Sequence, residues 1–393
     1  MRPPGIEDVM TGDLRRAQRA VFAIFFANGA GLASWVPHVP VVQASLGLRP
    51  SVLGLALLPM AVGALVGIPL AGRVAARVGS RAVVRASAVG FFTALGLPVL
   101  APSLPLLVAA LFILGASNGA LDVSMNAQAA AIEARWPRPI MSAFHGTWSL
   151  GGLVGAGVAA LALRVGVRPV AHVLGAAVIF GCATTVALVA LLPPAADVRD
   201  DGGGLHRPTG ALVGLGTIAL LALMAEGAMG DWSAVYLESS LGTSASTAAL
   251  GFAAFSLTMA AGRFLGDGLV ARWGNAALVQ TSAGTAAVGF GTALAVGHPV
   301  AAIAGCAAVG LGLANLIPIV FRTAGRLPGV AASEGIAAVG TAGYVGFLAG
   351  PPLIGLTAEV ATLPGALAIV AAALAWIAAI AGRFVPGAPR TGL

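Results

Sequence analysis

Apolar segments of about 20 residues follow one another along almost the whole chain. A helix of that length crosses the hydrocarbon core of a bilayer, so each segment predicts a transmembrane helix. Of the 393 residues, 58% are hydrophobic and only 9% are charged, which excludes an ordinary soluble domain. We place the segments at 18–44, 51–72, 82–101, 103–132, 139–163, 169–192, 211–237, 247–267, 276–296, 299–323, 333–357 and 362–384. The sequence therefore predicts an all-α membrane protein with twelve transmembrane helices.

The arginines indicate how these helices are oriented. Only Arg49, Arg164 and Arg168 of the 21 basic residues fall on the side opposite the termini, which leaves 18 on the side of the termini. Arginine-rich loops stay in the cytoplasm, so we expect both termini of this multi-pass protein there. The net charge of +7 does not indicate a nucleic-acid partner, because the arginines lie singly or in small groups between apolar segments.

The two halves of the chain repeat each other. Gly115 falls on Gly310 and Gly151 on Gly346, each 195 positions later. The direction of the repeat is parallel and each half holds six predicted spans. This is the arrangement of a secondary transporter whose halves are related by an axis along the membrane normal.

One long polar stretch separates the halves. Residues 193–210 read PPAADVRDDGGGLHRPTG, which predicts a flexible cytoplasmic linker. We therefore expect six-helix domains at 18–192 and 211–384, with cytoplasmic tails at 1–17 and 385–393.

Several motifs resemble the major facilitator superfamily. Residues 72–81, GRVAARVGSR, resemble its signature G-x3-D-R-x-G-R, with Ala76 where the aspartate is usual. Residues 262–274 resemble a second copy. The stretches ALDVSMNAQ, SAFHGTWSLGG and EGAMGDWSAVYL are similar to the fucose-permease-like branch, particularly to bacterial YbjJ-type inner-membrane proteins. The resemblance implies alternating access, with helices 1, 4, 7 and 10 lining a central cavity.

An acid in the fourth segment is the main candidate site residue. Asp122 has Asn118 and Asn126 four residues to either side, so the three polar groups share one helix face. Ionisable groups in hydrocarbon are costly and usually functional. The resemblance places Asp122 where sugar–proton symporters of this branch carry an acid for proton coupling. The alternative is an acid that is permanently bonded to one of the two asparagines.

A second acid, Glu226, lies in the seventh segment. The repeat places it close to the position of Asn28 in the first segment, and a hydrogen bond between those two is the plain alternative. With both segments lining the cavity, Asp122 and Glu226 would face each other, so we predict proton coupling for both. The first segment carries no acid from Asn28 to Trp35, in contrast to the symporters.

The fifth segment carries His145 and, one turn later, Trp148. A histidine can bind a proton or a substrate, and a tryptophan can stack on a sugar ring. The alternative for His145 is a histidine that is bonded to a neighbouring group, and the alternative for Trp148 is ordinary helix packing. The predicted substrate-binding set is Asn28, Asn118, Asn126, His145 and Trp148.

Charged residues near the segment ends form a predicted gate. The loop residues are expected to form ion pairs between the domains that keep the cytoplasmic side closed. With Ala76 in place of an acid, the first signature loop should form weaker ion pairs, and Asp267 would take over that role. Topology determination by positive charge is the alternative for the arginines. The gating set is Arg73, Arg77, Arg81, Asp267 and Arg272 on the cytoplasmic side and Asp231 near the external end.

The predicted function follows from these sites. We place acids but no deep arginine in the membrane core, which disfavours anionic substrates and leaves neutral polar solutes or cations. The sequence predicts a proton-coupled secondary transporter of a small solute such as a sugar; a proton antiporter that exports amphipathic or cationic compounds is the alternative. We expect a monomer that is not an enzyme and has no cofactor or metal. Without lysine the chain lacks a P-loop, and nothing suggests an oxyanion site beside Ser142 and His145.

Overall fold

The computed structural model describes residues 6–48, 50–194 and 209–386. The helices in chain order are α1 (Ile6–Trp35), η1 (Val36–His38), α2 (Val39–Ser45), α3 (Pro50–Val78), α4 (Ser80–Ala94), α5 (Leu97–Leu100), α6 (Leu104–Glu133), α7 (Met141–Arg164), α8 (Pro169–Ala187), η2 (Leu188–Ala190), α9 (Gly210–Val235), the π-helical η4 (Tyr236–Ser240), α10 (Ala245–Trp273), α11 (Asn275–Val296), α12 (Pro299–Leu313), α13 (Leu316–Ala324), α14 (Ala332–Val360) and α15 (Leu363–Phe384).

The predicted all-α membrane fold is confirmed. Within the described ranges, ten helical stretches are long and apolar enough to cross a membrane. The helices α10 and α11, with 29 and 22 residues, complete the twelve transmembrane helices. The first helix begins at Ile6 rather than near residue 18, because its polar start continues the helix beyond the apolar segment.

Prolines divide three of the predicted spans. Pro37 and Pro40 follow the end of α1, Pro98 follows the break between α4 and α5, and Pro318 follows the break between α12 and α13. Proline has no N–H and cannot donate to the carbonyl four residues earlier, so the regular helix ends there.

The described residues form two compact units. Unit 1 combines the described residues of 6–136 and 147–194 with the segment 325–337, and unit 2 combines 209–324 and 338–386 with the segment 137–146. Each unit therefore contains a short segment from the other half of the chain. The predicted domain boundaries stay predictions, and most of the predicted linker, 195–208, lies outside the described residues.

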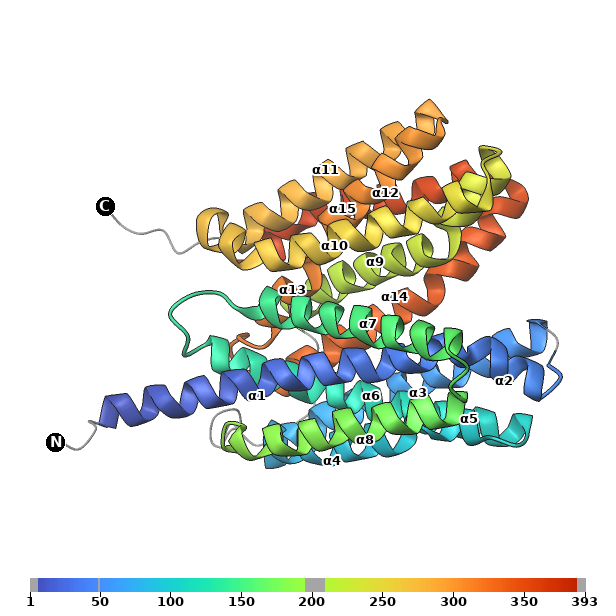
Figure 1. Cartoon of the computed structure of the whole chain (residues 1–393). Helices are drawn as coiled ribbons and strands as arrows, with labels where there is room; N and C mark the ends of the chain where they lie inside the picture. Colours follow the sequence, from blue (N-terminus) through green and yellow to red (C-terminus); the bar gives the residue numbers. More distant parts are fainter. Residues whose placement is uncertain (1–5, 49, 195–208, 387–393) are drawn as a thin grey trace, which may run out of the picture. The chain divides into compact units, whose positions relative to one another are not determined.

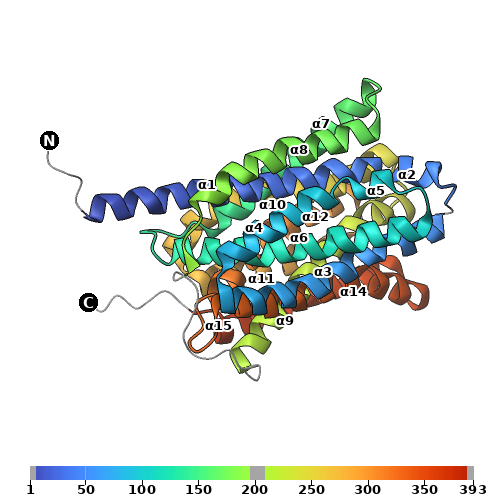
Figure 2. The same ribbon diagram turned by 90° about the horizontal axis from the view of Figure 1, so that it is seen from below.

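Within unit 1, α1 lies beside α8 and α3 beside α6 (Figures 1 and 2). Within unit 2, α11 packs on α12 and α15, and α10 packs on α12. A Cβ at Gly115 would meet the carbonyl oxygen of Met60, and a Cβ at Gly310 would meet that of Phe255. Both members of the second pair lie 195 positions after those of the first, so glycine permits the same close contact in both units.

The turns before α4 and α11 also repeat. Gly79 has φ 86° and Gly274 has φ 78°, and each precedes the first residue of the next helix. A positive φ is inexpensive only for glycine, which explains the glycine in both signature loops.

Candidate transport site

Asp122 lies inside α6, a 30-residue helix that is almost wholly apolar. The Nδ2 of Asn126 donates to the Asp122 carboxylate (3.1 Å) and to its main-chain oxygen (2.9 Å). The side chain of Asp122 is half-buried, whereas Asn126 is fully buried. The helix thus has the predicted polar face, and Asn126 of this face is hydrogen-bonded to Asp122.

Three predicted substrate residues form a hydrogen-bonded chain, which we call the amide chain: Trp148, Asn28 and Asn118. The Nε1 of Trp148 donates to Asn28 Oδ1 (2.9 Å), and Asn28 Nδ2 donates to Asn118 Oδ1 (2.9 Å). The chain joins α7, α1 and α6. Asn118 lies one turn before Asp122, so the amide chain and the acid share a face of α6.

Close packing of α1 on α7 makes this chain possible. A Cβ at Gly29 would meet the carbonyl oxygen of Trp148, and a Cβ at Gly151 would meet that of Phe26. Glycines let two backbones approach this closely, which brings the indole N–H within reach of Asn28.

Unit 2 carries a second polar group, around Arg263 of α10. Arg263 is only 7% exposed and interacts electrostatically with Glu226 of α9. His145 also interacts with Arg263, and its ring lies 6.0 Å from that of Phe321. The predicted residues Glu226 and His145 therefore share an electrostatic partner, Arg263, that was not predicted.

The prediction that the membrane core has no deep arginine is wrong. Arg263 lies ten residues before the end of α10, about 15 Å along the helix axis. Arg263 lies inside the predicted span 247–267, four residues before its end, yet the topology prediction counts it among the arginines on the side of the termini. The predicted absence of a deep arginine was the reason to disfavour anionic solutes. Since Arg263 is buried, that reason no longer holds.

The carboxylate of Asp267 caps the start of α7. It accepts hydrogen bonds from the backbone N–H groups of Ser142 (3.1 Å) and Ala143 (2.8 Å). The first N–H groups of a helix have no partner within it, and a negative charge there is favoured by the helix dipole. Arg322, which is 2% exposed, donates to the same carboxylate (3.1 Å) and to Asn275 Oδ1 (3.0 Å). We call this group the α7 cap.

Comparisons with known proteins identify the family. The model of the Major Facilitator Superfamily matches residues 21–236. An uncharacterized MFS-type transporter of Yersinia pestis is 36% identical over 357 residues, which cover 91% of this chain and 93% of the relative. The chain belongs to the Major Facilitator Superfamily. It is therefore a multi-pass membrane transporter of small molecules and not an enzyme.

Two further comparisons agree with this family. An uncharacterized transporter of Sinorhizobium fredii is 35% identical over 365 residues, covering 92% of this chain and 97% of the relative. The fucose:proton symporter FucP of E. coli superposes with a TM-score of 0.78 over 94% of this chain and 98% of FucP. FucP is 15% identical, so this likeness is one of fold alone.

Among the described residues, the other predicted gating residues of this MFS transporter form none of the hydrogen bonds of the α7 cap. Arg81 donates to the carbonyl of Val189 in its own unit (3.2 Å). Four more are exposed: Arg73, Arg77, Asp231 and Arg272. The structure thus brings Asp267 into a cap and leaves those four on the surface.

Sequence reasoning missed an ion pair in unit 1. Arg326 donates to Glu133 at 3.2 Å, and the side chain of Glu133 is only 2% exposed. Glu133 lies one residue beyond the predicted fourth span. An acid so close to the end of an apolar segment could have indicated an ion pair there.

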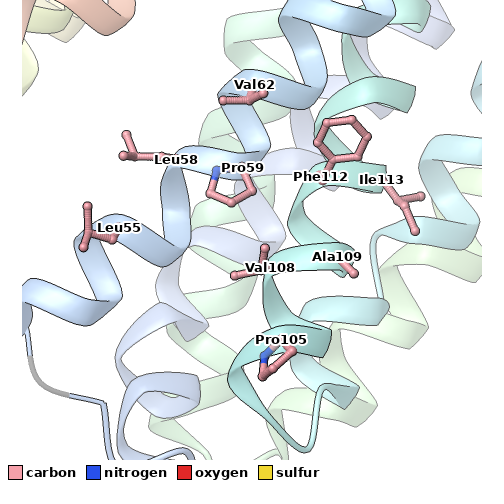
Figure 3. A pocket seen from close by; sticks show the side chains of 9 residues that line it. All are labelled: Leu55, Leu58, Pro59, Val62, Pro105, Val108, Ala109, Phe112 and Ile113. Carbon is pink, nitrogen blue, oxygen red and sulfur yellow. The ribbon is translucent and has the colours of Figure 1, made fainter.

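The N-terminal parts of α3 and α6 line an apolar groove of about 680 Å³ in unit 1 (Figure 3). Its lining residues are all apolar: Leu55, Leu58, Pro59, Val62, Pro105, Val108, Ala109, Phe112 and Ile113. A polar solute would find no hydrogen-bond partner among these side chains, so we do not assign the groove to the transport site.

Proposed function

We propose that this MFS protein is a proton-coupled secondary transporter of a small neutral polar solute, such as a sugar, that works by alternating access. Asp122 and Glu226 exchange the proton. The solute binds near Asn28, Asn118, Asn126, His145 and Trp148. The α7 cap and the charged loop residues control opening. The protein acts as a monomer in the bacterial inner membrane, with both termini in the cytoplasm.

One observation carries this proposal: a half-buried carboxyl inside an apolar helix, one turn from the amide chain. Asp122 can bind and release a proton there, and the amide chain offers hydrogen-bonding groups to hydroxyls. The name of FucP, a fucose:proton symporter with the same fold, supports the choice of a sugar and a proton as the first ligands to test.

Two other solute classes stay open. The acids Asp122 and Glu226 suit an amphipathic cation, which a proton antiporter would export. The buried Arg263, which interacts electrostatically with Glu226, suits an anionic group, because a protonated Glu226 would no longer balance the charge of the guanidinium. Both classes belong in the substrate panel.

The test is counterflow in proteoliposomes that contain the purified protein. Liposomes are preloaded with unlabelled sugars, lipophilic cations or organic anions, and uptake of the labelled solute is followed. An imposed pH gradient then shows whether protons drive accumulation. We expect one class to exchange and a proton gradient to concentrate it. Absence of exchange for every class under every gradient would contradict the proposal.

A further inference from the structure

Two buried histidines join the end of the first transmembrane segment to α8. His38 Nε2 and His172 Nδ1 lie 2.9 Å apart, and the ring centroids are separated by 5.0 Å. His38 is 0% exposed and His172 is 9% exposed. The two rings bridge η1 and α8, and α1, which directly precedes η1, packs beside α8 (Figure 2).

The outer nitrogens of both rings are also buried. His38 Nδ1 and His172 Nε2 have no hydrogen-bond partner among the described residues. Two neutral imidazoles carry two ring protons, and one of these lies between the rings whichever ring donates. One outer nitrogen therefore carries a proton without an acceptor, and the other carries a lone pair without a donor.

Counting protons shows what the pair can accept. One added proton binds the bare outer nitrogen and keeps the shared hydrogen bond, but it creates a buried charge. A second added proton would place N–H groups on both facing nitrogens, 2.9 Å apart, and the shared bond would be lost. The pair is therefore neutral when both rings are buried and share their hydrogen bond.

The described residues around the pair offer no charge to balance an added proton. Arg168, one turn before His172, is exposed and carries the same sign. Among the described residues, η1, α2 and α5 have no Asp, Glu, Lys or Arg. The charged side chains described on α1, α4 and α6 lie away from this end of their helices: Asp13, Arg15, Arg16, Arg19, Arg81, Arg85, Asp122 and Glu133. A protonated pair therefore gains most from contact with water.

We propose that His38 and His172 form a proton-sensitive clasp that holds the end of the first segment against α8 and opens when the pair takes up a proton. On the expected topology this end faces the external medium, so external acid opens the clasp. The repeat places Ser233 and Leu367 at the corresponding positions, so the device belongs to unit 1 alone. The clasp is separate from the proton site at Asp122 and needs no identified substrate.

The test compares wild type with the double variant His38→Gln/His172→Asn. The Gln amide N–H replaces the ring Nε2–H, and the Asn carbonyl oxygen replaces the ring Nδ1, so the link is kept without a titrating group. Backbone hydrogen exchange is measured in nanodiscs for residues 29–45 and 168–178 between about pH 7.5 and 5. After correction for intrinsic exchange, the wild type should open more at low pH, by up to about tenfold per pH unit. The double variant should stay protected.

His298→Gln is the matched control, because His298 is an exposed histidine of unit 2. It should behave like wild type. Unchanged protection of wild type across this pH range, or the same loss of protection in the double variant, would overturn the proposal. If the double variant does not fold, histidine ring ¹⁵N spectra of wild type give the answer. Rings of His38 and His172 that take up no proton as the two segments open would refute the clasp.

Discussion

Asp267 shows how one side chain can serve a helix to which it does not belong. Its carboxylate supplies the acceptor that the first turn of α7 lacks and also pairs with the buried Arg322. The first residues of α7 belong to unit 2, whereas the rest of the helix belongs to unit 1. All the residues of the α7 cap therefore lie in unit 2, although most of α7 lies in unit 1.

Loss of the Asp267 charge should destabilise the protein more than loss of the whole pair. Asp267→Asn leaves the guanidinium of Arg322 buried without a counter-charge, so we expect a loss of roughly 3 kcal/mol in the free energy of unfolding. The double variant Asp267→Asn/Arg322→Gln removes both charges and should recover much of that loss. Thermal unfolding in detergent measures these two variants and the single variant Arg322→Gln. A double variant whose loss equals the sum of the single losses would show that the two charges are not coupled.

At the scale of helices, glycines set which pairs pack closely. The contacts of Gly115 with Met60 and of Gly310 with Phe255 join α3 to α6 and α10 to α12 in equivalent places. Gly151 packs on α1 in unit 1, and Gly346 packs on the carbonyl of Leu220 of α9 in unit 2. These repeated contacts position α6, and with it Asp122.

Gly115→Ala should separate α3 from α6, because its Cβ would collide with a carbonyl oxygen that belongs to a rigid helix. We expect a destabilisation of about 1–3 kcal/mol and a lower yield of folded protein. Gly157→Ala in α7 is the control, since nothing lies within 4 Å of the added Cβ. Its unfolding temperature should be unchanged or slightly higher, and an equal loss in both variants would argue against close packing as the cause.

For the whole molecule, hydropathy was sufficient to predict the twelve helices, because each apolar segment must satisfy its backbone hydrogen bonds within itself. Helical spacing was sufficient to predict the polar face around Asp122, since positions four apart share a face. The pairing of Asp267 with Ser142 and of His38 with His172 could not be predicted. These partners lie 125 and 134 residues apart, and no local pattern links them.

Proton coupling through Asp122 is the central claim, and one pair of measurements on Asp122→Asn tests it most directly. Counterflow needs no net proton movement, whereas accumulation driven by a pH gradient does. The variant should keep counterflow of the transported solute and lose at least about tenfold of the pH-driven accumulation. Asp13→Asn, the same change at an exposed acid, should keep both activities. Wild-type accumulation by Asp122→Asn would contradict the claim.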